Sequence, residues 1–231
     1  MSTNEELLFR IGKFLSHAGL CSRRDAVEFL ENHVVLYNGE QIFRPDQKIP
    51  KSAELVVDGK SIFLEVTTKI VLLNKPVGYT CSHAEYKGEK SIFRLLPMSM
   101  QNFYFAGRLD KESRGLVILS NNGDFIHHLT HPSNRITKTY NLRTSRPLAD
   151  FELEKCVKGV FDKNEILKFD SITPQDKKCY YTVKLHQGRN REIRRVIDKF
   201  NVFVVDLQRI SIDNYQISEI DEGSYKISQE S

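Results

Sequence analysis

The sequence predicts an α+β fold with a largely antiparallel sheet, on the basis of three observations. Helical and strand patterns are mixed without the regular strand–helix–strand rhythm of a parallel sheet. Several strand candidates are short apolar runs that end in turn-forming residues, such as 70–73 and 116–119. The chain has 231 residues, of which 40% are hydrophobic, so it can bury a core without disulfide or metal support. We expect a small unit joined to a larger one.

The sequence of the first unit predicts two helices followed by short strands. Apolar residues with helical spacing occur over 11–18, and Gly19 is placed to end that helix. Ser22 is suited to cap a second helix. The strand candidates at 34–37 and 55–57 are each followed by a two-residue turn signal, Asn-Gly or Asp-Gly.

The second unit predicts a longer succession of strands and helices, separated by Asn, Gly and Pro. Strands are expected at 70–73, 116–119, 139–142, 166–172, 180–185, 202–205 and 207–212. Helices are expected at 124–131, 150–158 and 190–200. The first of these helices must end before Pro132, because proline disfavours a helical conformation in the residue before it.

Composition excludes several classes of protein. No apolar stretch approaches the roughly 20 residues that span a bilayer, and the N-terminus lacks a signal-peptide pattern, so a cytoplasmic protein without a membrane partner is expected. A monomer is expected because no long apolar surface stripe is left unexplained. The cysteines are far apart and form no Cys-x-x-Cys pair, which argues against a zinc ribbon or a disulfide framework. They are Cys21, Cys81, Cys156 and Cys179.

The first two predicted helices carry a small group of basic residues. These are Arg10, Lys13, Arg23 and Arg24. Phosphate oxygens would suit such a surface, especially next to the free N–H groups of a helix start. However, residues 1–69 carry nine basic and ten acidic side chains, so charge alone favours an ordinary solvated helix face over an RNA-binding surface.

A carboxylate between two glycines is the most informative feature of the second unit. Asp110 lies in a loop bracketed by Gly107 and Gly115, and the loop leads into an apolar strand. Three basic residues surround it, namely Arg108, Lys111 and Arg114. Nearby cations keep a carboxylate ionised, and an ionised Asp can act as a nucleophile or a base. A charged surface turn would give the same pattern.

The predicted helix at 190–200 separates its arginines by direction. Ile193, Val196, Ile197 and Phe200 share one face, which we expect to be buried. Arg194 lies about 100° from Ile193, at the margin of that face, where it suits a semi-buried ion pair or can extend its stem along the core edge. Arg191 and Arg195 lie on the opposite side, open to solvent or phosphate, and Arg189 just precedes the helix.

Tyr140 lies in a basic stretch, since residues 131–146 include Lys138 and no acidic residue. An aromatic ring among cations suits base stacking with phosphate contact, although a core aromatic on a strand explains it too.

Several motifs together resemble known families. The run RIGKFLSHAGLCSRRDA at 10–26 is similar to the start of an S4 RNA-binding domain, although His33 stands where that family usually has Gly. The segments 107–110, 138–140 and 188–195 resemble the three catalytic-domain motifs of pseudouridine synthases. The segments 73–79 and 129–132 are similar to the RsuA/RluB ribosomal branch of that family, which places an S4 domain first.

The resemblance implies a domain order and an activity. It implies a tail at 1–7, an S4-like (alpha-L) domain at 8–62, a linker at 63–68, a catalytic domain with a mainly antiparallel mixed sheet at 69–225, and a tail at 226–231. The reaction would be isomerisation of a uridine in ribosomal RNA or a ribosomal precursor particle, without cofactor or metal.

The resemblance also implies roles for individual residues. Asp110 would be essential, Tyr140 would pack against the target base, and Arg194 would pair with Asp110. Ser113 and Glu192 depart from the usual Thr and Gln of the family. The residues expected to contact RNA are Arg10, Lys13, Arg23, Arg24, Lys75, Arg108, Lys138, Arg189, Arg191 and Arg195.

Two other classes of function compete with this interpretation. A non-catalytic S4-type RNA-binding protein could serve ribosome assembly. A metal-dependent hydrolase could use His127, His128 and His131, but the segment lacks the Glu of a His-Glu-x-x-His site. The sequence leaves open which uridine is modified, whether the RNA is free or assembling, and whether Asp110 acts as nucleophile or base. It favours large-subunit over small-subunit RNA.

Overall fold

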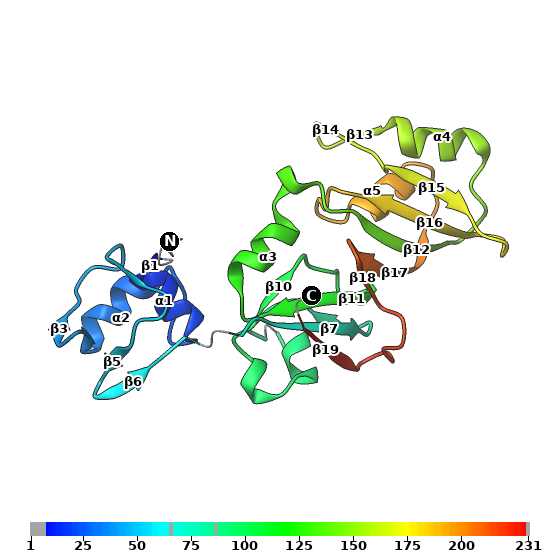
Figure 1. The fold of residues 1–231 in the computed structure, drawn as a ribbon. Coiled ribbons are helices and arrows are strands. Elements are labelled where there is room, and N and C mark those ends of the chain that lie inside the picture. Colours follow the sequence, from blue (N-terminus) through cyan, green and yellow to red (C-terminus); the bar gives the residue numbers. More distant parts are fainter. Residues whose placement is uncertain (1–7, 65–66, 86, 230–231) are drawn as a thin grey trace, which may run out of the picture. The chain divides into compact units, whose positions relative to one another are not determined.

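The computed structural model describes residues 8–64, 67–85 and 87–229, which fall into two compact units (Figure 1). The first unit comprises residues 1–68 and the second residues 69–231. The tail expected at 1–7 lies outside the described residues. None of the helices in the described part of the chain is both long and apolar enough to cross a membrane.

The first unit contains two short helices, α1 (Ile11–His17) and α2 (Ala26–Asn32). The first prediction is confirmed. The second helix begins later than Ser22 predicts, because the Ser22 hydroxyl accepts the backbone N–H groups of Arg24 (3.2 Å) and Asp25 (3.3 Å) and closes a separate turn. The basic pair at 23–24 therefore precedes the helix instead of forming its first turn.

The strands of the first unit form a four-stranded sheet in the order β3-β2-β5-β6 and a separate β1-β4 pair. They are β1 (Leu8–Arg10), β2 (Val35–Tyr37), β3 (Glu40–Gln41), β4 (Lys48–Pro50), β5 (Leu55–Val57) and β6 (Lys60–Ile62). Both predicted turns are confirmed, since Asn38 and Asp58 adopt positive φ before their glycines. His33 is extended (φ −130°), so the residue that replaces Gly there carries no left-handed strain.

The second unit is built on a nine-stranded, largely antiparallel sheet in the order β15-β16-β12-β17-β11-β7-β19, with β10 and β18 pairing beside it. Its strands are β7 (Lys69–Lys75), β10 (Tyr104–Ala106), β11 (Arg114–Ser120), β12 (Lys138–Thr144), β15 (Ser171–Pro174), β16 (Tyr180–Leu185), β17 (Val204–Ile212), β18 (Tyr215–Gln216) and β19 (Tyr225–Gln229). The pair β11–β17 is parallel. The predicted α+β class is confirmed.

Helices and short strand pairs surround this sheet. The α-helices are α3 (Gly123–Thr130), α4 (Asp150–Lys158) and α5 (Glu192–Asp198). Smaller strand pairs are β8 (Tyr79–Thr80) with β9 (Lys90–Ser91) and β13 (Val160–Asp162) with β14 (Glu165–Leu167), and the 3₁₀ turns are η1 (Ile92–Leu95), η2 (Met98–Met100) and η3 (Pro132–Asn134).

Three strand predictions differ from the structure. The strands expected at 202–205 and 207–212 are replaced by the single strand β17, which begins at Val204 and runs through Asp206. Asp206 does not interrupt it and bonds to Arg114 of the neighbouring strand (2.8 Å). The run at 166–172 divides between the β13–β14 hairpin and β15. The expected tail at 226–231 is wrong for 226–229, which pair with β7 in β19, while 230–231 lie outside the described residues.

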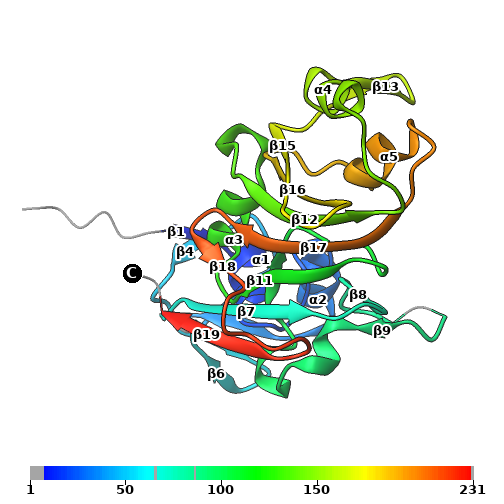
Figure 2. The same cartoon turned by 90° about the vertical axis from the view of Figure 1, so that its right-hand side faces the viewer.

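Alternating residues of the central strands supply two cores. Val71 of β7 and Val117 of β11 face the cluster that includes α5, whereas Ile70 and Leu116 face the cluster that includes α3. Figure 2 shows β17, β11 and β7 lying side by side in that order. The central strands are apolar on both faces because both faces are covered.

The two halves of the sheet join at a close backbone approach between β11 and β17. Only Arg114–Gln208 and Gly115–Arg209 pair along this junction within the described residues. Gly115 has φ +112°, and a Cβ atom there would lie 2.6 Å from the Arg209 nitrogen and closer still to its carbonyl oxygen. Glycine is therefore required for β11 and β17 to meet.

Gly115→Ala is expected to destabilise the second unit by about 3 kcal/mol, from overpacking and from the left-handed backbone. Gly78→Ala is the matched control, because Gly78 has φ +92° and nothing within 4 Å of the added methyl group. It should cost about 1 kcal/mol. Urea unfolding of both variants measures the difference, and equal losses would contradict the close approach.

Candidate active site

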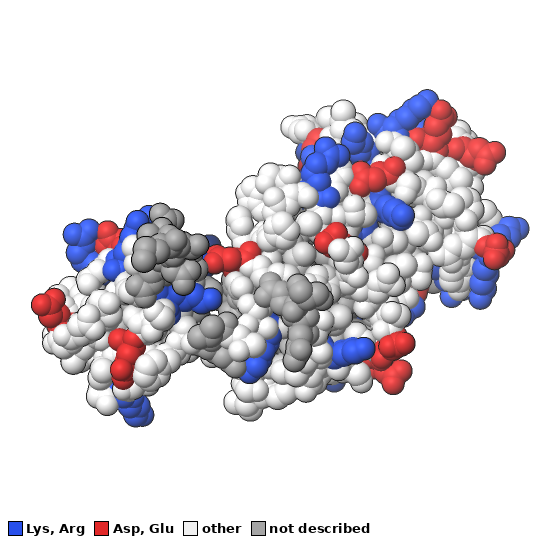
Figure 3. Space-filling view, in the orientation of Figure 1, with Lys and Arg blue, Asp and Glu red and all other residues white. Residues whose placement is uncertain are grey.

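The second unit contains a cavity of about 470 Å³, lined by the loop between β10 and β11, by β12, and by the segment that leads into α5. Seven basic and three acidic side chains line it. They are Glu89, Arg108, Asp110, Lys111, Lys138, Arg189, Arg191, Glu192, Arg194 and Arg209. On the face drawn in Figure 3, by contrast, blue and red side chains are interspersed. The excess of positive charge in the cavity suits an anionic ligand.

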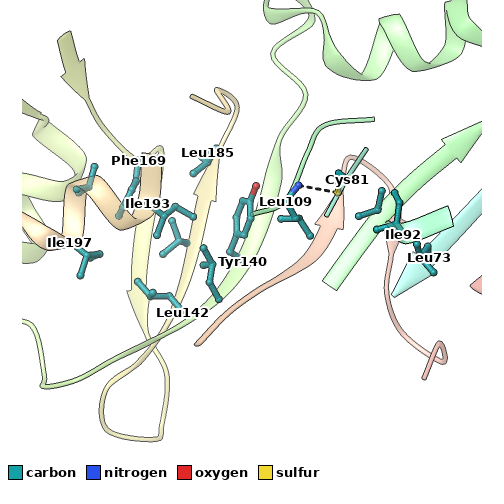
Figure 4. Packing of buried hydrophobic residues seen from close by; sticks show 14 of the residues in the cluster. Leu73, Cys81, Ile92, Leu109, Tyr140, Leu142, Phe169, Leu185, Ile193 and Ile197 are labelled. Atoms are coloured by element: carbon teal, nitrogen blue, oxygen red, sulfur yellow. Dashed lines mark hydrogen bonds between the residues drawn. The ribbon is translucent and has the colours of Figure 1, made fainter. Parts of the chain in front are cut away.

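Asp110 is held on a loop whose backbone is fixed on both sides of it. The Leu109 N–H donates to Cys81 Sγ (3.4 Å; Figure 4), and the Ser113 N–H donates to the Asp110 carbonyl oxygen (3.0 Å). The carbonyl oxygen of the residue after Asp110 accepts the N–H of Gly78 (2.8 Å). The side chain of Asp110 is 27% exposed. These bonds give the carboxylate a defined direction while leaving it open to the cavity.

Two arginines from the α5 region meet the Asp110 carboxylate. Oδ2 of Asp110 lies 3.6 Å from Nη1 of Arg191 and 3.8 Å from Nε of Arg194. Arg194 also donates from Nη2 to the hydroxyl of Ser113 (3.1 Å) and to the Glu112 carbonyl (3.2 Å). Burial lowers the pKa of Arg194, and Arg191 lowers it further. The contacts to Asp110 are ion pairs and are too long for hydrogen bonds.

The Arg194 Nε atom is buried and has no hydrogen-bond acceptor among the described residues. Since Oδ2 of Asp110 lies 3.8 Å from it, a movement of less than 1 Å would satisfy this donor. A buried donor without an acceptor is costly, so closure of this pair is favoured.

Tyr140 belongs both to the core and to the cavity wall. It is 7% exposed, lies on β12, and pairs across the sheet with Arg209 of β17. Figure 4 shows its ring between Ile193 and Leu109, all three being members of one apolar cluster. The ring is therefore fixed in position, with part of its surface lining the cavity.

Arg209 is a cavity residue that the sequence analysis missed. It is 2% exposed and donates from Nε to the Leu116 carbonyl (2.7 Å) and from Nη2 to the Gly107 carbonyl (3.3 Å). The sequence contained a signal for this burial, because Leu207 and Arg209 are two residues apart on β17 and so lie on the same, inward-facing side of the strand. A lone arginine in phase with buried positions indicates an interior role.

The structure contradicts the expected RNA contact of Lys75. Its side chain is fully buried, and its ammonium group donates to the carbonyl oxygens of Pro76 and Tyr79, both at 2.9 Å. Burial lowers its pKa to about 8. Lys75 therefore supports the turn at 76–79 from inside and cannot reach a phosphate.

Two other expected RNA contacts are held by carboxylates. Arg195 contacts Asp162 (2.6 Å) and Glu165 (2.8 Å), is 16% exposed and lies outside the cavity, so the structure opposes its role as a free phosphate ligand. Arg189 lines the cavity but shares Glu165 (2.9 Å). Lys138 also lines the cavity, half-buried, with its ammonium group donating to two backbone carbonyls.

The remaining expected RNA contacts are exposed or lie in the first unit. Arg108 is exposed at the cavity. Arg10, Arg23 and Arg24 are exposed in the first unit, where Lys13 lies 4.1 Å from the centre of the Phe9 ring. These side chains present cationic surface to solvent on their own unit.

The histidines near α3 do not assemble a metal site. The rings of His127 and His131 lie 4.9 Å apart, and His131 Nδ1 bonds to the Ser133 hydroxyl (2.7 Å). Across the described part of the chain, no group of three or more His, Cys, Asp or Glu side chains is placed to hold a metal ion. The metal-hydrolase alternative has no support in this geometry.

Glu192 is a buried carboxyl group in the cavity wall. It is 4% exposed, Oε2 accepts the Arg189 N–H (3.0 Å), and Oε1 has no hydrogen-bond partner among the described residues. Burial raises its pKa. Burial therefore makes the charged form of Glu192 less favourable in the folded protein than it is in water.

Comparison with known proteins gives consistent matches. The family described as RNA pseudouridylate synthase matches residues 69–199. An uncharacterized RNA pseudouridine synthase of Rickettsia felis is 31% identical over 94% of this chain and 95% of its own. Ribosomal large subunit pseudouridine synthase B of Buchnera aphidicola is 32% identical over 89% of this chain and 86% of its own. Dual-specificity RNA pseudouridine synthase RluF of Salmonella typhi is 30% identical over 94% of this chain and 74% of its own.

A crystal structure of a pseudouridylate synthase has the same fold as this chain. The TM-score is 0.67 at 24% identity, and the match covers 96% of both chains. The similarity thus extends over both compact units.

Glu192→Gln should stabilise the protein at pH 8 and have little effect near pH 4. A carboxyl group whose pKa is raised by folding contributes stability that is lost as pH rises above its ordinary value of 4.5. Urea unfolding at both pH values measures this. Glu154→Gln is the control, because Glu154 is exposed and pairs with Lys158. An equal effect of Glu192→Gln at both pH values would contradict the assignment.

Proposed function

The chain belongs to the RNA pseudouridylate synthase family, and from this premise we propose that it isomerises a specific uridine of ribosomal RNA at Asp110. The chain is therefore an RNA pseudouridine synthase, an isomerase. The observation that carries the site assignment is a basic cavity in which the Asp110 carboxylate lies between Arg191 and Arg194. Tyr140 forms part of the same cavity wall.

The reaction rearranges one nucleotide without a net change in composition. The N1–C1′ bond of uridine breaks, the base rotates, and C5 joins C1′. The hydrogen on C5 leaves as a proton, and N1 gains a proton, so no oxidant, reductant or phosphate donor is consumed. A target base in stacked or paired RNA must first leave its stack, at a cost of a few kcal/mol.

Each cavity residue has a role that follows from its position. The fixed ring of Tyr140 offers an apolar surface for the displaced base. Asp110 attacks the sugar as a nucleophile or accepts a proton as a general base. Both routes need an ionised carboxylate next to the target nucleotide. Arg194 and Arg191 hold this carboxylate in place through their ion pairs. The exposed Arg108 at the cavity suits a flanking phosphate.

The names of the relatives support ribosomal RNA as the substrate, and the Buchnera aphidicola relative in particular supports large-subunit RNA. The S4-like sequence of residues 8–62 supports RNA binding by the first unit, whose Arg23 and Arg24 lie exposed in the turn before α2. We propose that the enzyme is a cytoplasmic monomer that acts on ribosomal RNA or a precursor particle.

Tritium release from ribosomal RNA labelled at uridine C5 tests the catalytic assignment. The protein should release tritium, because C5 must lose its hydrogen, and Asp110→Ala should lower the rate at least about a hundredfold. Asp176→Ala, at an exposed carboxylate in a turn, is the matched control and should retain full activity. Folding and RNA affinity are measured for each variant.

Normal turnover by Asp110→Ala would overturn the role of Asp110. Absence of release by the native protein, from free RNA and from ribosomal precursor particles alike, would favour the non-catalytic assembly factor.

The double variant Arg23→Ala/Arg24→Ala should weaken binding to ribosomal RNA and reduce the slope of log affinity against log salt by about 1 for each lost phosphate contact. Arg44→Ala is the control in the same unit, since Arg44 is paired with Asp46 (2.8 Å). Filter binding over a salt series measures both. Equal affinities of the double variant and the control would exclude this surface as an RNA contact.

A further inference from the structure

Arg209 is a buried cation whose charge has no carboxylate partner among the described residues. It is 2% exposed, and its hydrogen bonds run to two backbone carbonyls, those of Leu116 and Gly107. A buried charge without an opposite charge is costly, and a neutral apolar residue would fit a sheet interior at lower cost. The position of Arg209 therefore calls for a reason beyond packing.

Two further cations lie near Arg209 and share this property. Lys75 and Lys138 bond to backbone carbonyls, and no ion pair involves them in the described part of the chain. Burial lowers the pKa of both lysines, and the charge of Arg209 adds to the effect. Asp110 acts on Lys75 in the opposite direction. Three cations, Lys75, Lys138 and Arg209, thus lie near one another without an ion pair among the described residues. Asp110, Glu112 and Glu192 are the carboxylates that act on the pKa values of the two lysines.

Arg209 contacts both ends of the loop that carries Asp110. Its side chain bonds to Gly107, three residues before Asp110, and to Leu116, six residues after it. Its backbone pairs with Gly115 in the parallel junction. Gly107 has φ +68°, and a Cβ atom there would lie 3.5 Å from Nη1 of Arg209. The guanidinium therefore lies directly against the start of the loop.

We propose that Arg209 is a positioning residue for Asp110, which it holds at the reacting position by clamping together the two ends of the loop at 107–116. Lysine cannot reproduce this arrangement, because Arg209 donates from two separate nitrogen atoms, Nε and Nη2, whereas an ammonium group has a single nitrogen. The effect on the reaction rests on the proposed function, whereas the clamp itself is a property of the RNA-free protein.

Hydrogen exchange of the RNA-free protein tests the clamp. In Arg209→Lys, backbone amides of 107–113 should exchange at least about tenfold faster than in the native protein. A peptide covering β16 in the same sample reports global unfolding and should change little. Arg143→Lys is the matched control, since Arg143 is exposed on the neighbouring strand β12. If Arg209→Lys does not fold, Arg209→Gln, which keeps amide donors, replaces it.

Single-turnover tritium release at saturating RNA tests the consequence for the reaction. Arg209→Lys should lower the rate about a hundredfold while its RNA affinity stays within about twofold, because misplacement of the reacting group slows chemistry without removing phosphate contacts. A merely structural role would change the folded fraction and leave the rate of the folded enzyme unaltered.

The outcomes separate the two proposals. Unchanged exchange at 107–113 in the lysine or glutamine variant overturns the clamp, whatever the activity. Faster exchange with an unchanged single-turnover rate overturns the positioning of Asp110. Absence of tritium release by the native protein counts against the proposed function, while the exchange result still decides the clamp.

Discussion

The close parallel approach of β11 and β17 at Gly115 and Arg209 is the constraint on which the rest of the second unit depends. It joins β15-β16-β12-β17 to β11-β7-β19 in one sheet. Because β11 begins at the end of the Asp110 loop, the same junction sets where that loop ends. Arg209, which pairs with Gly115, also donates from its guanidinium to the carbonyl oxygen of Gly107 at the start of the loop. Fold and site are therefore coupled through one pair of backbones that only glycine allows to meet.

The cavity is built with more positive charge than its own carboxylates balance. Its wall carries seven basic and three acidic side chains, in a chain whose net charge is only +4. One of the three acids, Glu192, is buried, and this burial raises its pKa. The basic side chains of the cavity repel one another, and the phosphates of a bound RNA would reduce this repulsion. The same excess of positive charge suits an anionic ligand and supplies the two arginines that pair with Asp110.

Local patterns in the sequence were sufficient for elements whose partners are apolar. The helical spacing at 190–200 correctly placed Ile193, Val196 and Ile197 inside, and the runs that became β7 and β11 were found. Patterns failed where a polar residue has a distant partner. Asp206 interrupts an apolar run in sequence, yet Arg114 satisfies it across the strands. From the sequence, Lys75 is predicted to be a surface cation, because the neighbouring residues do not indicate that its ammonium group bonds to two backbone carbonyls.

The arginines around α5 show why charge alone does not identify a site. Arg194 and Arg195 are adjacent in sequence and about 100° apart around the helix. That rotation brings Arg194 to Asp110 and Ser113, whereas it brings Arg195 to the carboxylates of the β13–β14 hairpin. Arg194 has a buried Nε atom 3.8 Å from the Asp110 carboxylate, whereas Arg195 is neutralised by Asp162 and Glu165. The chemistry available to a basic cluster is therefore set by where the acidic partners lie, and only the fold determines that.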